Sequence, residues 1–332
     1  MFDKKMAMLY ILDIMKEYSD ENHLLTHKDI INKLNNIHHV ELERKTVATN
    51  LDLLAEYGYD INKGPTGGFY LGERDLDETE IKFLIDAVYS SKLITGKQAT
   101  AISKKIYSNL SMYEQKDFSY IHKSTDIYRT SSNDLFLNMD ILKEAIEKRK
   151  MVKFSYLEYN RKGKLTERKF TDSSKTMTFT LSPYYLVNNF SKYYLIANNQ
   201  KYKNHVYYRV DFMKDITITD TDIVPIEDIE TLGKDFNITK HINDHIYMFG
   251  GKVINAKIEI LKDKAITDVK DWFNDNASIY EENDKVYANI KSDDKAFFYW
   301  ALQYHENIKV LEPESMVNKI VDSLKKNLEK YL

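Results

Sequence analysis

Cysteine is absent from the 332-residue sequence. Its absence excludes disulfides, thiolate metal sites, iron–sulfur clusters and a cysteine nucleophile, and it fits a reducing compartment. The 4 prolines and 10 glycines are too few for collagen-like, mucin-like or long flexible segments. Apolar runs stay short of the roughly 18 residues that a membrane helix needs, and Asp13 and Lys16 interrupt the apolar N-terminal stretch, so we expect no signal peptide. The sequence therefore predicts a soluble, cytoplasmic protein without a membrane segment.

An excess of positive charge is also missing. The chain has 48 Lys and Arg against 51 Asp and Glu, a formal net charge of −3. This is not the bulk charge of a protein that coats nucleic acid, so any contact with DNA or RNA has to come from a local patch. Hydrophobic residues make up 43% and charged residues 30% of the chain, which allows buried cores. The length predicts two or three domains.

Residues 1–74 are patterned as helices followed by a hairpin. Thr26 is a good N-cap, and Asp29 completes a variant of the capping box at the start of a second helix. A third helix is expected over about 44–57, with Gly58 as the residue that ends it. Its apolar stripe consists of Val47, Leu51 and Leu54. Two short strands, at about 59–61 and 69–71, flank a segment rich in turn-forming residues.

Helices followed by a glycine-rich hairpin form the pattern of a winged helix-turn-helix. In that module the third helix enters the DNA major groove and the hairpin touches the backbone. Arg can pair with guanine and Asn with adenine, while Thr and Lys can hold phosphates. The predicted DNA-binding residues are Thr26, Lys28, Arg44, Lys45, Thr46, Thr49, Asn50 and Lys63. The alternative is a unit used for packing or dimerisation alone, because exposed Arg and Lys are usually solvated and the segment to residue 75 has more acidic than basic residues.

Residues 75–332 alternate between segments with helical periodicity and segments with strand periodicity. Residues 75–134 read as a helical linker. Residues 135–222 begin with a helix and continue as closely spaced short strands, which suggests a small barrel. Residues 223–251 read as a second helical linker, entered at Pro225. Residues 252–332 follow the order βαββαβ, which predicts a ferredoxin-like sheet. The expected fold class is multidomain α+β.

Tyrosines and cations are interleaved in the predicted barrel. Aromatic rings can stack bases and cations can hold phosphates, so we interpret this region as an effector pocket. Its predicted residues are Tyr156, Arg168, Tyr184, Tyr194, His205, Arg209 and Asp211. Other interpretations stay open: alternate tyrosines can simply fill a barrel interior, Arg209 and Asp211 can pair with each other, and His205 alone is more often a surface or packing histidine.

Two sets of motifs resemble known families. The runs KTVATNLDLL at 45–54, GYDI at 58–61 and GGFYL at 67–71 resemble the DeoR-type helix-turn-helix of bacterial regulators. That family usually carries Arg-Asp where this chain has Thr49 and Asn50. The runs SPYYLV at 182–187, KYYLIA at 192–197 and YYRVDFM at 207–213 resemble the WYL domain.

The second resemblance also extends beyond those runs. Tyr193, Tyr194 and Leu195 stand where the WYL family has Trp-Tyr-Leu, and the Arg-x-Asp element is present. Residues 298–314 resemble the extension that follows many WYL domains. The resemblance implies a small Sm-like, SH3-type barrel with a sensing role, linked in several members to nucleic-acid or nucleotide ligands.

Catalytic signatures are missing from the sequence. It has no phosphate-cradling GxxxxGK[ST] loop, no GxGxxG opening a helix and no HExxH, and we expect no metal, cofactor or catalytic residue. We therefore predict a bacterial, one-component transcriptional regulator that binds duplex DNA as a homodimer and responds to an effector such as single-stranded nucleic acid or a nucleotide. The alternatives are a nucleic-acid-binding accessory protein without operator specificity and, less favoured, a nucleotide-processing enzyme.

Overall fold

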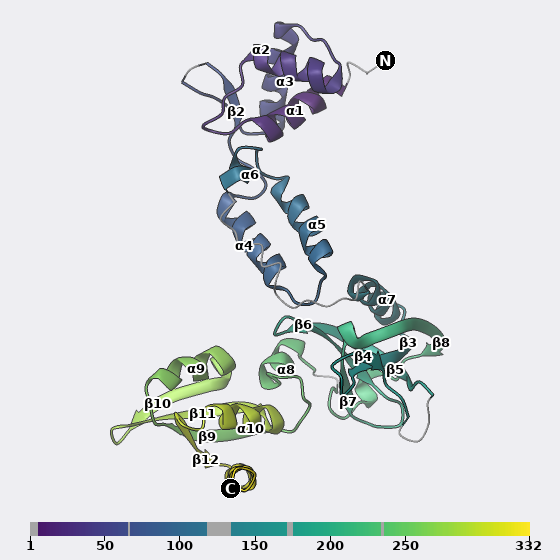
Figure 1. Cartoon of the computed structure of the whole chain (residues 1–332), viewed down its shortest axis with the longest axis vertical. Coiled ribbons are helices and arrows are strands. Elements are labelled where there is room, and N and C mark those ends of the chain that lie inside the picture. Colours follow the sequence, from purple (N-terminus) through teal and green to yellow (C-terminus); the bar gives the residue numbers. More distant parts are fainter. Residues whose placement is uncertain (1–5, 66, 118–133, 171–174, 234–235) are drawn as a thin grey trace. The chain divides into compact units, whose positions relative to one another are not determined.

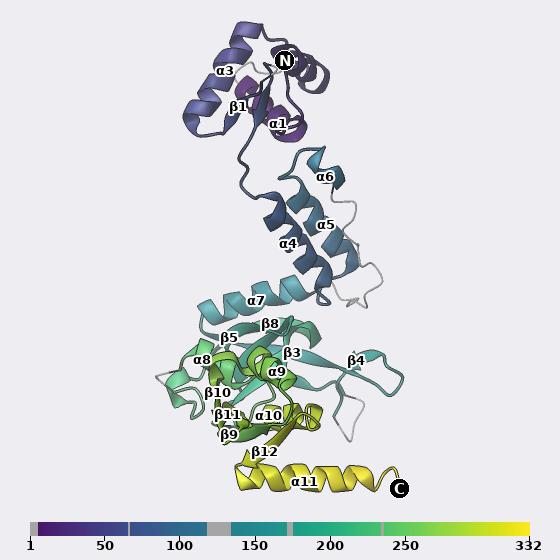
Figure 2. The same cartoon turned by 90° about the vertical axis from the view of Figure 1, so that its left-hand side faces the viewer.

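A computed structural model describes residues 6–65, 67–117, 134–170, 175–233 and 236–332 (Figures 1 and 2). The chain divides into two compact units, Met1–Asn133 and Asp134–Leu332. Helices and antiparallel sheets occur in both units, so the protein is a multidomain α+β protein. In the part of the chain that is described, no helix combines the length and apolarity needed to cross a membrane.

The first unit begins with helices and a hairpin that follow the local sequence signals. The elements are α1 (Ala7–Tyr18), α2 (His27–Lys33), the π-helical turn η2 (Leu34–His38), α3 (Arg44–Tyr57), β1 (Ile61–Lys63) and β2 (Phe69–Leu71). The predicted capping box is present, because the Thr26 side chain accepts the Asp29 N–H and Asp29 accepts the Thr26 N–H. Helix α3 ends at Gly58 with φ 117°, as predicted. The helices enclose one core that includes Ile11, Met15, Ile30, Leu34, Val47, Leu51 and Leu54.

Helices α4 (Glu78–Ser90), α5 (Gly96–Tyr107) and α6 (Glu114–Asp117) follow in the same unit. Asp77 and Thr95 cap α4 and α5 with complete capping boxes, and α4 and α5 pack against each other (Figures 1 and 2). The predicted helical linker of residues 75–134 thus contains helices up to residue 117. Its remainder, 118–133, lies outside the described residues.

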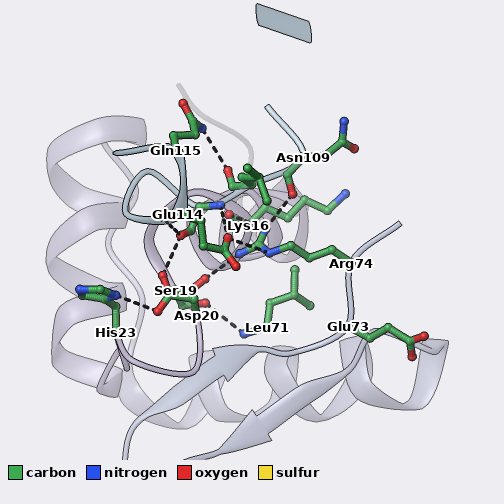
Figure 3. A network of polar contacts seen from close by, with 12 residues as sticks. Lys16, Ser19, Asp20, His23, Leu71, Glu73, Arg74, Asn109, Glu114 and Gln115 are labelled. Atoms are coloured by element: carbon green, nitrogen blue, oxygen red, sulfur yellow. Dashed lines mark hydrogen bonds and ion pairs between the residues drawn. The ribbon is translucent and has the colours of Figure 1, made fainter. Parts of the chain in front are cut away.

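A buried arginine joins these helices to the first part of the unit (Figure 3). Arg74 Nη1 donates to the carbonyl oxygens of Lys16 and Asn109 at 2.9 and 3.2 Å. Its Nη2 donates to the carbonyl oxygen of Ser19 at 2.7 Å, and Nε lies 3.4 Å from Glu114 Oε2. Because these carbonyls lie at the C-terminal ends of α1 and α5, the cation binds the negative ends of two helix dipoles.

The second unit begins with α7 and a bent antiparallel sheet. Its elements are α7 (Leu135–Glu147), β3 (Lys150–Tyr159), β4 (Leu165–Glu167), β5 (Thr178–Asn189), β6 (Lys192–Asn198), β7 (His205–Arg209) and β8 (Met213–Asp222). The strand order is β4-β3-β5-β6-β7, and β8 pairs with β3. Helix α7 packs on β3, β5 and β8, as Figure 2 also shows.

Two features of this sheet refine the expected series of closely spaced short strands. Strand β5 runs without a break from Thr178 to Asn189, because an irregularity between Pro183 and Tyr185 lets it bend without ending. Strand β7 ends at Arg209, and Val210–Phe212 form a 3₁₀ turn (η4). The chain has to turn there because the next strand pairs with β3 rather than with β7.

Residues 223–251 differ from the predicted helical linker. They contain the 3₁₀ turn η5 (Ile226–Asp228) and the helix α8 (Ile238–Asp244), and much of the remaining described segment is irregular. Its apolar side chains Ile229, Leu232 and Met248 are buried against Tyr184 and the sheet. The need to bury these side chains makes the segment part of the folded unit.

The C-terminal elements have the predicted βαββαβ order. They are β9 (Val253–Ile260), α9 (Lys264–Phe273), the 3₁₀ turn η6 (Asn274–Asn276), β10 (Ala277–Glu282), β11 (Lys285–Asp293), α10 (Asp294–Gln303), β12 (Ile308–Glu312) and α11 (Glu314–Leu328). The strand order is β10-β11-β9-β12, with antiparallel pairing throughout. Phe297 and Trp300 of α10 are fully buried in its core.

Candidate functional site

The polar side of α3 faces away from the core of the first unit. Val47, Leu51 and Leu54 are buried, whereas Arg44 and Lys45 are exposed at the start of the helix. The other predicted DNA-binding residues are exposed at Thr26, Lys28, Thr46, Thr49 and Lys63, and half-buried at Asn50. A helix with one apolar face buried and a polar start free is sterically available to a ligand.

Local hydrogen bonds hold some of these side chains. Thr49 Oγ1 donates to the Lys45 carbonyl at 3.0 Å, and Asn50 Nδ2 donates to the Thr46 carbonyl at 2.7 Å. Thr26 Oγ1 donates to Asp29 Oδ2 at 2.6 Å as part of its cap. The Thr49 and Asn50 contacts are exposed side chain–backbone bonds, which can be exchanged for contacts to a ligand at small cost.

Cations from separate elements converge on the start of α2. The pKa of His27 is lowered, first by burial and then by the positive charges of Arg44 and Lys63, against a smaller opposing effect of Asp52. Arg44 belongs to α3 and Lys63 to β1. The positive charges of both side chains therefore act on one imidazole at the start of α2.

A cleft of about 960 Å³ lies in the second unit. Three predicted effector residues line it: Tyr156 from β3, Arg168 after β4, and His205 from β7. Burial raises the pKa of Tyr156 to about 12, and its hydroxyl accepts the Arg209 N–H at 3.1 Å. Arg168 is exposed and lies 3.6 Å from Glu158. The cleft therefore combines a ring and a cation at its wall.

Two predicted tyrosines lie elsewhere. Tyr184 is buried, and its hydroxyl donates to the Val224 carbonyl at 2.8 Å; burial raises its pKa to about 12. Tyr194 is half-buried against the apolar cluster that contains Tyr184, Ile229 and Leu232, and burial raises its pKa as well. Neither lines the 960 Å³ cleft.

Arg209 and Asp211 form a bidentate ion pair with each other. Arg209 Nε donates to Asp211 Oδ1 at 3.1 Å, and Nη2 donates to Oδ2 at 2.6 Å. The guanidinium also stacks over the Phe212 ring, 4.0 Å from its centroid. Neither residue lines the cleft. This pairing corresponds to one of the alternatives that the sequence left open, and it holds the turn after β7.

Sequence reasoning missed two further cations that line the cleft. Lys252 and Lys295 line it, together with Gly250, Gly251 and Asp294. Residues 252 and 294 are linked by reciprocal bonds: Lys252 N donates to Asp294 Oδ1 at 3.1 Å, and Asp294 N donates to the Lys252 carbonyl at 2.9 Å. A side chain at position 251 would collide with Asp294. The Gly-Gly-Lys run can be recognised in the sequence, but it lies far along the chain from β3, so the sequence does not predict that it reaches the same cleft.

A chain of hydrogen bonds runs beside the cleft. The Tyr207 hydroxyl lies 2.7 Å from His205 Nε2 and 2.6 Å from His241 Nε2, so it donates to one ring and accepts from the other. His205 Nδ1 lies 2.6 Å from Thr231 Oγ1. Burial is the main cause that lowers the pKa of His205 to about 4 and of His241 to about 3. Both rings are therefore neutral at pH 7.

No grouping of acidic and histidine side chains in the described ranges could hold a metal ion. The histidines beside the cleft satisfy one another through Tyr207 and backbone groups. The cleft is therefore lined by hydrogen-bonding groups, aromatic rings and the cations Arg168, Lys252 and Lys295.

A comparison with protein families identifies one domain within the second unit. The sequence profile of the WYL domain matches residues 138–218, and no curated protein matches the chain. Among solved structures, one similar chain is proteasome accessory factor B/C (PafBC) of Arthrobacter aurescens, with 14% identity, a TM-score of 0.29, and coverage of 96% of this chain and 50% of that one.

The chain thus spans about half the length of PafBC. Another similar structure is described as a CRISPR Cas-related protein, with 14% identity, a TM-score of 0.39, and coverage of 98% of this chain and 84% of that one. The profile match includes every predicted effector residue from Tyr156 to Asp211. The second unit of this protein therefore contains a WYL domain at residues 138–218.

Proposed function

We propose that this protein is a cytoplasmic transcriptional regulator that binds duplex DNA with residues 1–74 and an effector with its WYL-containing unit. Residues 1–74 would form a DeoR-type winged helix-turn-helix, residues 135–222 an Sm-like barrel and residues 252–332 a ferredoxin-like extension. A homodimer would place two α3 helices on a two-fold related site. An effector that binds one dimer arrangement better than another would change the spacing of these helices.

The exposed polar start of α3 is the observation that carries the DNA-binding proposal. Helix α3 buries Val47, Leu51 and Leu54 while Arg44 and Lys45 remain exposed. Lys63 of β1 is exposed as well. The DNA major groove admits a helix whose side chains reach the base edges, and flanking cations contact the phosphates. Helix α3 would therefore enter the groove while Lys63 contacts the DNA backbone.

Genomic DNA selection with the full chain, followed by titration of a selected duplex at stated salt concentrations, tests this proposal. The double variant Arg44→Ala with Lys45→Ala should weaken binding at least tenfold. It should also reduce the magnitude of the slope of log K against log salt by about 2, because each lost phosphate contact removes about 0.9. Lys97→Ala, an exposed lysine of α5, is the matched control and should change neither quantity. Equal affinity of the double variant and the control would refute DNA binding through α3 and favour an accessory role.

The cleft supports an anionic, partly aromatic effector such as single-stranded nucleic acid or a nucleotide. Its cations Arg168, Lys252 and Lys295 can hold phosphate, and Tyr156 and Tyr208 present rings. Arg168→Ala combined with Lys252→Ala should weaken effector binding, whereas Lys97→Ala, an exposed lysine of the first unit that does not line the cleft, should not.

We further propose that the site binds without catalysis. Labelled oligonucleotides and nucleotides incubated with the full chain should be recovered unchanged. Turnover that is lost in Arg209→Ala would instead identify a nucleotide-processing enzyme. Arg168→Ala would then show whether the same cleft is responsible.

A further inference from the structure

An aromatic groove lies next to the cleft, outside the WYL domain match. It has a volume of about 870 Å³ and is lined by Tyr247, Phe249, Trp272, Lys295, Tyr299 and Gln303. These residues come from the segment after α8, from α9 and from α10. We call this set of residues the aromatic groove.

The rings of the groove form a continuous chain. Phe249 lies 5.7 Å from Tyr299 and 5.3 Å from Tyr247, measured between ring centroids. Tyr247 lies 5.2 Å from Trp272. Phe190, at the tip of the β5–β6 hairpin, extends the chain, with its centroid 4.9 Å from that of Trp272.

The two rings at one end of the chain are largely open to solvent. Phe249 is 51% exposed and Tyr299 is 57% exposed. Isolated exposed apolar residues are ordinary, but a contiguous group of exposed rings in a hollow marks a binding surface. Lys295 and Gln303 are also exposed in the same groove, so polar groups border the rings.

The aromatic groove is continuous with the cleft. Phe249 and Lys295 line both hollows. The cleft adds the cations Arg168 and Lys252, while Asp294 is held by the Lys252 N–H. Within the described residues, neither the Lys252 nor the Lys295 ammonium has an ion-pair partner. Rings and unpaired cations therefore follow each other along one connected surface.

We propose that the aromatic groove stacks bases of a single-stranded nucleic acid whose phosphates lie along Arg168, Lys252 and Lys295. This inference rests on the proposed effector function and extends it to a site outside the WYL domain. Proteins that bind single strands combine a cationic track with rings on which successive bases stack. The neighbouring cations favour this polyanionic partner over an apolar peptide or a second copy of the chain, which would bring no phosphate to them.

The protein contains its own reporter for this test. Of its two tryptophans, Trp272 lines the groove and Trp300 is fully buried in the core. Titration of the full chain with an oligothymidylate of about ten nucleotides, a length within single-strand site sizes, should quench tryptophan fluorescence. The same titration followed by anisotropy of a labelled oligonucleotide gives the affinity.

Phe249→Leu and Tyr299→Leu keep apolar volume but remove the stacking ring. Each should weaken oligonucleotide binding about tenfold, in keeping with the loss of one base stack. Tyr331→Leu, at an exposed ring beyond the end of α11, is the matched control and should bind like the unaltered protein. Unchanged far-ultraviolet circular dichroism of the variants will show that they fold.

The remaining outcomes separate this inference from the proposed effector function. If Arg168→Ala with Lys252→Ala loses binding while both groove variants retain it, the groove inference is overturned and the effector function stands. If the unaltered protein binds no oligonucleotide at low salt, single-stranded nucleic acid is excluded as the effector and the groove inference falls with it. Self-association that Phe249→Leu abolishes, with no effect on oligonucleotide affinity, would assign the groove to contact between copies instead.

Discussion

Replacement of Arg74 should uncouple the two halves of the first unit. Its guanidinium donates to the carbonyl oxygens of Lys16, Ser19 and Asn109, and its side chain is 8% exposed. Arg74→Ala removes these charge-assisted bonds and leaves three partly buried carbonyl groups without them (Figure 3). Loss of one partner from a buried charged network costs about 3–5 kcal/mol, so the first unit should lose that much free energy of unfolding.

The two tryptophans make the assay specific to each unit. Both Trp272 and Trp300 belong to the second unit, so their fluorescence follows that unit during urea unfolding of the full chain. Circular dichroism at 222 nm follows both units, and the first unit contributes many of the helices. At an m-value of about 2 kcal/mol per molar urea, Arg74→Ala should lower the midpoint of the first unit's dichroism transition by about 2 M. The tryptophan transition should not move.

Two further variants sharpen the result. Arg74→Lys keeps the charge but lacks the planar fork that reaches several carbonyls, and it should lose about half as much stability. Lys97→Ala removes an exposed cation of α5 and should change the stability by less than about 0.5 kcal/mol. A dichroism transition that stays in place in Arg74→Ala would show that the network does not stabilise the unit. Equal shifts in both transitions would refute its local action.

Two other predictions concern a buried imidazole and a helix end. Burial lowers the pKa of His241 to about 3, below the value of about 6.5 for an unfolded histidine. Because the unfolded chain binds the proton more readily, the free energy of unfolding falls as the pH drops below about 6.5. At pH 5 the loss of free energy of unfolding is about 2 kcal/mol, and urea unfolding followed by tryptophan fluorescence measures it. His241→Gln should lose less stability between pH 7 and 5. An equal loss in this variant would contradict the assignment to His241. Gly58→Ala should destabilise the first unit by about 1 kcal/mol, because φ is 117° there, whereas Gly96→Ala, at the start of α5 with open space around it, should be neutral or stabilising in the same dichroism assay.

Local signals determined the elements that the sequence predicted well. The capping box of Thr26 and Asp29 and the glycine that ends α3 are set by neighbouring residues, so pattern alone fixed these ends. The βαββαβ order of the C-terminal elements was equally readable, because apolar periodicity is a property of consecutive residues. The resemblance at Tyr193 to Leu195 led to the WYL domain that the profile match confirms.

Contacts between distant residues decided what the sequence left open. The sequence left open whether Arg209 and Asp211 pair with each other; the pairing of β8 with β3 forces a turn at these residues, and they bind each other. The irregular course of residues 223–251 follows from burial of Ile229 and Leu232 against the sheet, which helical spacing could not reveal.

By itself, the sequence determined most of the helices and strands, the exposed cationic start of α3 and the WYL domain, because each depends on spacing within a few tens of residues. The tertiary structure alone decided which side chains share a hollow. Lys252 and Lys295 meet Tyr156 and Arg168, and Phe249 meets Tyr299, only after the chain has folded. The physical reason is that hydrophobic burial and strand pairing select contacts by three-dimensional complementarity, and separation along the chain carries no information about them.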